Sequence, residues 1–374
     1  MANQTEHTQE LRKKAEMLLQ STPLIDGHND LPWQYRTRVN GVVSAIDLAS
    51  PQPELHTDIP KLKKGLLGGQ FWSVYVATNL DQSKYVSATM EQIDLVYDLI
   101  DRYRDTLQLA LNAEEVSSAF SQRKIASLIG MEGGHCIGNS LGTLRMFYKL
   151  GARYLTLTHN RNVGWADSCT DRPESNGLSD FGRDVVREMN RLGILIDLSH
   201  VGERSTMEAI EHSEKPVAVT HANCKGYFDR PRNKTDEAVR LLAERGGVVG
   251  ATAICSFLKT QFESTLDDYL DAIDDMVQRI GPDQVGVGID FTQDQPESFW
   301  RYIGSQQGTS YPAVFQDPNV KWEEYKLYPD DLTSPDELPN LASGLQRRGY
   351  SGEEITGILG GNWLRLFGEV WEGA

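Results

Sequence analysis

The stretch Asp26-Gly27-His28-Asn29-Asp30 follows the short apolar run Pro23-Leu24-Ile25. If this stretch ends a buried strand, the side chains of His28 and Asp30 stand two residues apart and point to the same face. An imidazole and a carboxylate side by side can bind a borderline-soft divalent metal. Most His-x-Asp pairs are surface polar residues. A metal site is favoured here because later strand-like runs also end in potential metal ligands.

Apolar runs of this kind recur along the chain, separated by amphipathic stretches with helical spacing such as Met90 to Tyr103, Asp180 to Leu192 and Leu266 to Ile280. Buried strands alternating with helices predict a parallel sheet covered on both faces, and eight of them predict a closed (β/α)₈ TIM barrel. A doubly wound open sheet is the alternative, but no G-x-G-x-x-G follows the first run. The eight runs are Leu24 to Asp26, Phe71 to Ala77, Ile125 to Met131, Tyr154 to Thr158, Ile194 to Leu198, Val217 to Thr220, Val248 to Thr252 and Val285 to Ile289.

Three further segments complete the predicted fold. Arg36 to Lys64 is expected to form a long loop after the first strand, and Gln293 to Pro339 a long loop after strand eight that covers the mouth of the barrel. Glu353 to Phe367 is expected to be a helix that closes the barrel. Since there is no linker, low-complexity tract or internal repeat, residues 1–374 are predicted to form a single domain.

Composition narrows the class of partner. The formal net charge of −16 argues against nucleic acid and anionic membranes, since phosphates bind Lys and Arg. The first 20 residues are polar and charged, and no apolar run reaches the roughly 18 residues of a membrane span. We therefore expect a cytoplasmic protein whose four cysteines are free thiols.

The predicted strands end in residues that can do chemistry. In a barrel the C-terminal ends of the strands converge on one mouth, where active sites lie. Four of the eight histidines stand directly at strand ends, and His135 lies just beyond another. Together these positions favour a metal site over eight unrelated surface or core histidines. The strand-end residues are His28, Asp30, Glu132, His159, His200, His221 and Asp290.

This pattern suits two metal ions, which need separate ligands and a bridging carboxylate. His28 and Asp30 can hold one ion, His200 and His221 the other, and Glu132 can bridge them. Ligands of this kind suit Zn²⁺ first, with Mn²⁺, Fe²⁺ and Co²⁺ left open.

The remaining strand-end residues have roles to be tested. Asp290 can take a proton from a water and pass it to a leaving amine, or it can orient His28. His159 can donate a hydrogen bond to an oxyanion, or it can be a core histidine. His135 is expected to support Glu132 from behind or to pack under its loop.

These residues give the chain a resemblance to the renal (membrane) dipeptidase family of binuclear zinc dipeptidases. The matching stretches occur in the family's order: Asp26-Gly-His-Asn-Asp-Leu-Pro-Trp33, Gly130-Met-Glu-Gly-Gly-His135, Leu155-Thr-Leu-Thr-His-Asn160 with Trp165-Ala-Asp167, Asp197-Leu-Ser-His200, Val219-Thr-His-Ala-Asn223, Gly288-Ile-Asp290 and Gly361-Asn-Trp-Leu-Arg365. The resemblance implies a (β/α)₈ barrel, often a homodimer, that cleaves dipeptides with a free C-terminal carboxylate.

The resemblance also implies individual roles. The metal ligands would be His28, Asp30, Glu132, His200 and His221. His159 would contact the scissile carbonyl, Asp290 would shuttle protons, and Arg232 would bind the substrate carboxylate.

Two positions depart from the family pattern. The Val-Pro usual after the Arg-Asn pair is Lys234-Thr235 here, and a tyrosine that helps to hold the carboxylate is replaced by Ile254. Because isoleucine donates no hydrogen bond, the pocket wall differs while the ligand set is intact. Some intracellular fungal relatives release glycine from Cys-Gly units of glutathione-derived conjugates in secondary metabolism. An unusual, larger or more apolar substrate of that kind is therefore the expectation.

Two other functions remain open on sequence grounds. One is a barrel amidohydrolase acting on a lactone, phosphoester or cyclic amide. Such enzymes often carry His-x-His on strand one and a modified lysine on strand four, and this chain has neither. The other is an inactive binding protein, although such chains typically lose their metal ligands and this one keeps them.

Overall fold

Nine parallel strands make up the sheet of this computed structural model, which describes residues 2–292 and 326–371. The strands are β1 (Leu24–Asn29), β2 (Leu67–Ser73), β3 (Leu107–Leu109), β4 (Ile125–Glu132), β5 (Ala152–Thr156), β6 (Leu195–Asp197), β7 (Ala218–Val219), β8 (Val248–Ala251) and β9 (Val285–Val287). Their order is β2-β1-β9-β8-β7-β6-β5-β4-β3, and β2 also pairs with β4. That pairing closes eight strands into a ring, which confirms the predicted (β/α)₈ barrel.

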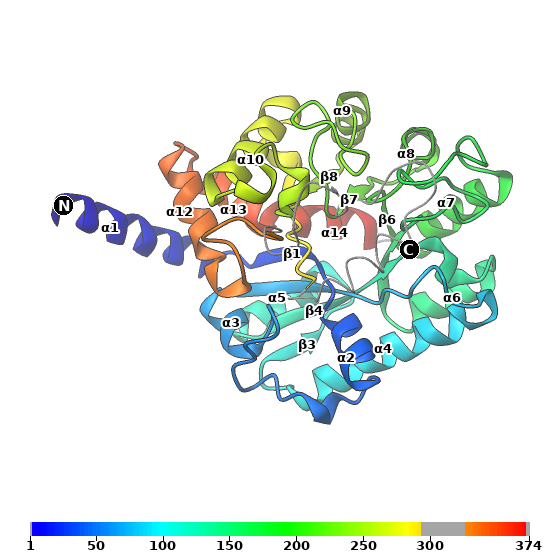
Figure 1. Cartoon of the computed structure of the whole chain (residues 1–374), viewed down its shortest axis with the longest axis horizontal. Coiled ribbons are helices and arrows are strands. Elements are labelled where there is room, and N and C mark those ends of the chain that lie inside the picture. Colours follow the sequence, from blue (N-terminus) through cyan, green and yellow to red (C-terminus); the bar gives the residue numbers. More distant parts are fainter. Residues whose placement is uncertain (1, 293–325, 372–374) are drawn as a thin grey trace.

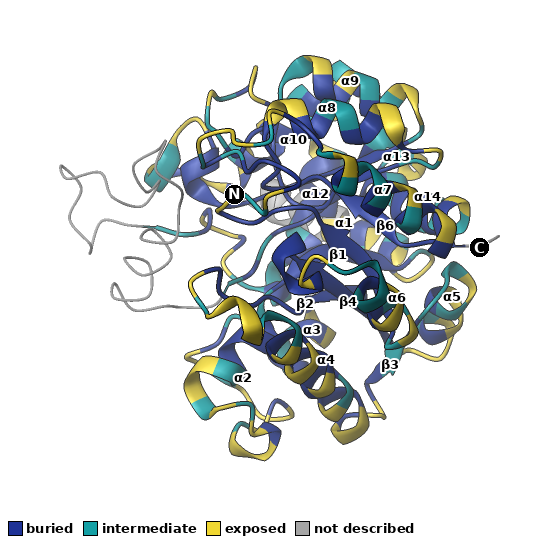
Figure 2. Cartoon of the chain, turned by 90° about the vertical axis from the view of Figure 1, so that its right-hand side faces the viewer, coloured by how far each residue is buried: buried dark blue, intermediate teal, exposed yellow. Residues whose placement is uncertain are grey.

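Most helices surround the barrel, whereas the N-terminal helix projects away from it and contacts α12 (Pro339–Arg347) (Figure 1). The apolar faces of the surrounding helices turn toward the strands, and their outer faces are exposed (Figure 2). The helices are α1 (Ala2–Leu19), α2 (Leu31–Val39), α3 (Ile59–Lys64), α4 (Tyr85–Arg102), α5 (Ala113–Ser121), α6 (Leu141–Lys149), α7 (Asp180–Leu192), α8 (Glu203–His212), α9 (Asp236–Glu244), α10 (Leu266–Ile280), α12 (Pro339–Arg347), α13 (Gly352–Thr356) and α14 (Asn362–Trp371). Side-chain caps begin several of them; the Thr235 hydroxyl, for example, accepts the amide of Ala238 at the start of α9.

The C-terminal helix α14 fills the lower end of the barrel, opposite the mouth. Trp363, at its first turn, is fully buried, and its indole N–H donates to the carbonyl of Val287 at 3.1 Å. Glycines make the space for it: a Cβ on Gly250 or Gly286 would meet the Trp363 ring at 3.0 or 2.6 Å. The helix predicted over Glu353 to Phe367 is therefore present only in part: it is divided into α13 and α14 by a kinked π-turn at Gly357–Gly361, and α14 extends to Trp371 (Figure 1).

Two expectations about the connections need correction. Arg36 to Lys64 is not one long loop, because it contains the end of α2, a short 3₁₀ turn at Val43–Ala45 and α3. In addition, β3 pairs with the first residues of β4 outside the ring and was not predicted, since three residues give too little pattern.

The long loop predicted after strand eight lies largely outside the described residues, as 293–325 are not placed. Its described end begins at Lys326, and the Tyr328 hydroxyl there donates to the carbonyl of Asp290 at 2.6 Å. All four cysteines are free thiols. No helix within the described ranges has the length and apolar character needed to cross a membrane.

Candidate metal centre

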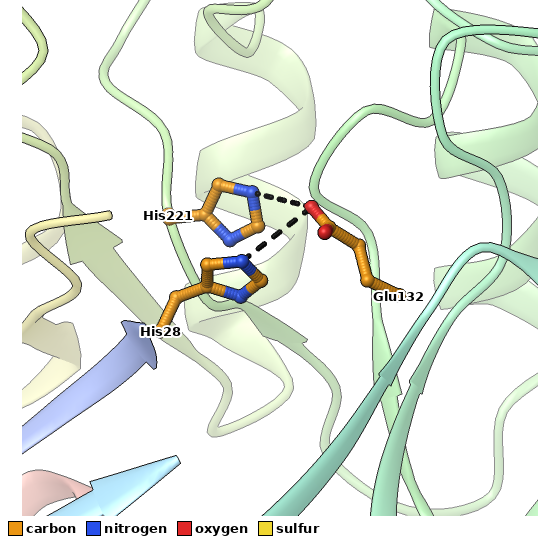
Figure 3. Close-up of side chains that lie close together, drawn as sticks. All are labelled: His28, Glu132 and His221. Atoms are coloured by element: carbon orange, nitrogen blue, oxygen red, sulfur yellow. Dashed lines mark ion pairs between the residues drawn. The ribbon is translucent and has the colours of Figure 1, made fainter. Parts of the chain in front are cut away.

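The C-terminal ends of the barrel strands bring the predicted ligands together. His28 lies in β1, with Asp30 directly after the strand, and Glu132 is the last residue of β4. His200 and His221 follow β6 and β7. The side chains of His28, Glu132 and His221 converge across the mouth (Figure 3).

One carboxylate oxygen lies at the middle of this group. Oε1 of Glu132 is 3.5 Å from Nε2 of His28, 3.5 Å from Nε2 of His221 and 3.2 Å from Nε2 of His200. Three imidazoles from three strands thus face one oxygen. A carboxylate that lies near imidazoles of both predicted ligand sets is suited to bridge two cations.

The remaining acidic residues lie beside His28. Its Nε2 is 3.5 Å from Oδ1 of Asp30 and 3.9 Å from Oδ1 of Asp290. Three overlapping groups of close donor atoms result: His28, Glu132 and His221; Glu132, His159 and His200; and His28, Asp30 and Asp290.

The chemistry of this donor set fits divalent ions. Nε2 of His28 and Oδ1 of Asp30 are buried without a hydrogen-bond partner. Nε2 of His200 lies 3.1 Å from Nε2 of His221, so two ring nitrogens face each other. Buried polar atoms without a partner are costly unless something binds them. One cation would give His28 Nε2 and Asp30 Oδ1 a partner, and a second could lie between the two facing imidazole nitrogens.

The ring orientation of His221 is set by a chain of hydroxyls. The hydroxyls of Thr156 and Thr220 donate to Oδ2 of Asp197 at 2.5 and 2.9 Å. Since the Thr220 hydroxyl gives its proton to Asp197, its oxygen accepts from Nδ1 of His221 at 2.8 Å. The lone pair of that imidazole is then on Nε2, which faces Glu132.

His28 has a partner on the barrel axis. Its Nδ1 lies 2.8 Å from the hydroxyl of Tyr154, a fully buried residue of β5. Gly130 is required opposite this tyrosine, because a Cβ there would lie 2.1 Å from the phenol ring. Sequence reasoning assigned no role to Tyr154 or Asp197, because each acts through a contact that only the closed barrel creates.

The electrostatics of the cluster also favour a cation. Burial lowers the pKa of His159, His200 and His221 well below the ordinary value, so these rings are neutral. Burial raises the pKa of Glu132 and of Asp290. For His28, burial acts to lower the pKa, but Tyr154 and the nearby carboxyls raise it well above its usual value. Burial thus favours the protonated carboxyls of Glu132 and Asp290, and divalent ions would favour their ionised forms and displace protons.

His159 and His135 differ in their surroundings. Nε2 of His159 is 3.6 Å from Oε1 of Glu132, and its ring lies 4.2 Å from that of His200, so it faces the centre. His135 packs under the loop instead: its Nε2 lies 2.8 Å from the carbonyl of Val76, and its ring lies against Gly133.

Arg232, the predicted partner of the substrate carboxylate, differs in its surroundings from the nearby Arg230. Arg232 is only 3% exposed; its Nη2 donates to the carbonyl of His221 at 3.3 Å, and its Nη1 has no partner. Its guanidinium lies over the ring of Phe257, 5.4 Å from the centroid. Arg230 is bound to Gln261 at 2.8 Å and lies over Phe228. Each arginine has one buried N–H without a partner, Nε in Arg230 and Nη1 in Arg232, but only the guanidinium of Arg232 is bound to the backbone of His221, a predicted ligand.

Comparison with known proteins agrees with this geometry. Residues 12–315 match the family model described as membrane dipeptidase, peptidase family M19. The chain is 36% identical over 371 residues to "Dipeptidase verJ" of Clonostachys rogersoniana, an alignment covering 96% of this chain and 87% of that protein. It is 34% identical over 371 residues to human "Dipeptidase 3", covering 98% of this chain and 69% of that protein.

Solved structures show the same fold. An amidohydrolase from Pseudomonas aeruginosa superposes with a TM-score of 0.80 at 28% identity, covering 96% of this chain and 99% of that one. The probable dipeptidase PvdM from the same organism superposes with a TM-score of 0.82, covering 98% of this chain and 100% of that one. At 19% sequence identity, this similarity supports the fold alone.

Proposed function

This chain belongs to the membrane dipeptidase family, peptidase family M19, and we propose that it is a binuclear metal-dependent dipeptidase that cleaves dipeptides with a free C-terminal carboxylate. Membership of this metallo-dipeptidase family makes the chain an enzyme and displaces the lactone-hydrolase and inactive-protein alternatives. The observation that carries the proposal is Oε1 of Glu132, which lies within 3.5 Å of imidazole nitrogens from three strands.

The proposed ligands divide into two sets that share Glu132. His28 and Asp30 belong to one set, and His200 and His221 to the other. Two divalent ions, Zn²⁺ in the first place, would lower the pKa of a shared water toward about 7 and polarise the scissile carbonyl. The imidazole and carboxylate donors support this choice of metal.

Asp290 is proposed to move the proton. Its carboxyl group is beside Asp30 and His28, on the edge of the centre where a water between the two ligand sets can be reached. It would accept the proton of the attacking water and deliver it to the leaving amine nitrogen. Tyr328 holds its backbone carbonyl, which fixes the residue in its left-handed conformation at φ +69°.

His159 is proposed to bind the carbonyl of the scissile amide, and Arg232 the C-terminal carboxylate of the dipeptide. His159 is neutral because burial lowers its pKa, and a neutral imidazole still has one N–H to donate to the developing oxyanion. The unpaired N–H of Arg232 would bind the C-terminal carboxylate of the substrate. These two side chains therefore set the direction in which a dipeptide lies across the centre.

The replacement of a tyrosine by Ile254 supports a more specific proposal about the substrate side chain. Ile254 is 2% exposed and offers only apolar surface where relatives often have a tyrosine. We therefore propose substrates with bulky apolar side chains, such as S-substituted Cys-Gly units from which glycine is released. We also propose that the protein forms a homodimer and is located in the cytoplasm.

The experiment that tests the proposed function compares acid and amide substrates. Loss of one partner of a desolvated charge pair typically costs about 2–5 kcal/mol, or very roughly 30- to several-thousand-fold in kcat/KM. Arg232→Ala should show this loss on free-acid dipeptides and little change on C-terminal amides. The matched control is Arg230→Ala, whose guanidinium already has Gln261 as a partner.

Metal analysis and a substrate panel complete the test. The wild-type protein should hold two divalent ions per chain and should cleave S-substituted Cys-Gly at least as well as Gly-Gly. Equal losses on acid and amide substrates would contradict the assignment of Arg232. A clear preference for Gly-Gly would contradict the narrower substrate proposal and leave dipeptidase activity standing.

A further inference from the structure

Lys234 is a buried cation at the position where the family usually has valine. It is 3% exposed and lies in the loop between β7 and α9. Its ammonium donates to the carbonyl of Val201 at 2.6 Å and to the hydroxyl of Thr206 at 3.3 Å. Burial lowers its pKa to about 8. A buried ammonium is costly, and these two hydrogen bonds are what offsets the cost here.

The backbone of Lys234 is bound to the segment that follows His221. Its N–H donates to the carbonyl of Asn223 at 2.9 Å, and its carbonyl accepts the N–H of Lys225 at 2.6 Å. Asn223 is two residues beyond His221 in the sequence. The main chain of Lys234 is therefore fixed relative to one metal-binding histidine.

The side chain of Lys234 reaches the segment that carries the other histidine of the same ligand set. Val201 directly follows His200, which has φ +63°. A left-handed conformation costs a non-glycine residue roughly 1–2 kcal/mol and persists only where neighbours hold it.

Hydrogen bonds hold His200 and Val201 from several sides. The carbonyl of His200 accepts the Cys169 N–H at 2.8 Å and the Thr158 hydroxyl at 3.1 Å. The next carbonyl, that of Val201, accepts the Thr206 hydroxyl at 3.2 Å and the Lys234 ammonium. Of these donors, Lys234 is the one whose own backbone is bound to the segment after His221.

We propose that Lys234 is a positioning residue that joins the segments after His200 and His221, and so sets the affinity for the one ion that these two histidines hold. The inference rests on the proposed two-ion site. The two Nε2 atoms lie 3.1 Å apart, and the His221 N–H also donates to the Ser199 hydroxyl at 3.0 Å, so Lys234 adds a second connection beyond the two histidines. The pair formed by His28 and Asp30 has no hydrogen bond to Lys234 and should not depend on it.

The test is a Zn²⁺ titration of the metal-free full chain against a competing chelator. Lys234→Met keeps the length of the side chain and removes the donor. We expect one of the two Zn²⁺ ions to bind about 10–100-fold more weakly, the usual effect of removing a group that supports a ligand, with the other ion little changed. The matched control is Lys225→Met, in the same loop, whose side chain is 43% exposed and pairs with Asp229. It should bind both ions as wild type does.

Each outcome separates the two proposals. Lys234→Met could bind two ions with wild-type affinities, or it could bind both ions with equally reduced affinities. Either result would overturn the role of Lys234 and leave the two-ion site intact. A wild-type protein that binds one Zn²⁺ only would overturn the proposed function and this inference together. Should Lys234→Met not fold, Thr206→Val removes one of the two acceptors of the Lys234 ammonium, together with the hydroxyl donor to the Val201 carbonyl. A several-fold loss confined to one ion would support the proposal, and no loss would refute it.

Discussion

At the scale of single residues, the ability of the centre to bind metal depends on which nitrogen and oxygen atoms carry no proton. Burial lowers the pKa of His159, His200 and His221, and it raises the pKa of Glu132 and Asp290. Burial thus disfavours charge of either sign, and His28 is the exception, because Tyr154 and the nearby carboxyls raise its pKa. A divalent cation reverses this for the carboxyls, and metal binding must therefore release protons.

Asp290→Asn isolates the proton transfer from metal binding. An amide keeps the size of the side chain but cannot accept a proton from water. We expect kcat to fall by roughly 10²–10⁴, the usual range for a general acid–base group, with metal content near that of wild type. Loss of metal from this variant would instead make Asp290 a ligand. An unchanged kcat would remove it from the mechanism.

His135 gives a pH dependence of stability whose sign follows from burial. Burial lowers the pKa of His135 to about 4, whereas an unfolded histidine titrates near 6.5. Above pH 6.5 neither state binds the proton. As the pH falls from 6.5 toward 4, only the unfolded chain takes it up, so the folded state progressively loses stability.

His135→Gln removes this titration while its amide can still donate to the carbonyl of Val76. Relative to wild type, the variant should gain about 2 kcal/mol of unfolding free energy between pH 7 and pH 5, at roughly 1.4 kcal/mol per pH unit below 6.5. Urea unfolding of both metal-free proteins at the two pH values measures the difference. A difference that does not change with pH would show that His135 is protonated in the fold.

The same scale shows where sequence reasoning ends. The rule that ligands stand at strand ends predicted the residues that meet at the mouth, because it follows from the geometry of any parallel barrel. Tyr154 and Lys234 contact ligand segments that are more than 30 residues away in the sequence, so no local pattern reveals these contacts. Thr220 is adjacent to His221, but its role depends on the contact of its hydroxyl with Asp197 on another strand.

At the scale of elements, α14 links the sheet to the end of the chain. The glycines of β8 and β9 leave the space that the indole of Trp363 fills. A larger residue at either glycine would clash with the indole, and loss of the indole would leave a cavity. Trp363→Ala should destabilise the protein by about 3–5 kcal/mol, the usual cost of deleting a buried tryptophan or phenylalanine side chain. The midpoint of denaturant unfolding measures this loss, with exposed Met146→Ala as the control. A cost below about 1 kcal/mol would mean that the barrel end collapses around the missing ring.

Element prediction succeeded where a pattern was long and failed where it was short. The eight apolar runs became the eight barrel strands, and Asp180–Leu192 and Leu266–Ile280 became α7 and α10 with the predicted ends. The segment taken as a loop contains α3, in which Pro60 sits in the first turn, where a proline favours a helix start. Prolines favour loops in most positions, but at the start of a helix they stabilise it, so the proline content of this segment predicted a loop where α3 forms.

At the scale of the whole molecule, the proposed ligands come from the ends of β1, β4, β6 and β7. These strands are spread around the ring, so an ion held between them binds the closed barrel and not the unfolded chain. Binding to the native state alone stabilises it by RT ln(1 + [L]/Kd), or about 2.7 kcal/mol for each ion at a hundredfold excess over Kd.

Removal of metal should therefore lower the stability of the entire barrel and not only abolish activity. We expect the chelated protein to unfold at a lower temperature than the Zn²⁺-loaded protein at the same scan rate, and added Zn²⁺ should restore the higher value. Glu132→Gln, which loses the bridging carboxylate, should show little of this response, because neither ligand set is complete without it. A chelated wild type with an unchanged melting temperature would mean that the strand ends are held together without the ions. Ligands preorganised by Asp197, Tyr154 and Lys234 alone would then account for the geometry, and the coupling of metal binding to folding would be absent.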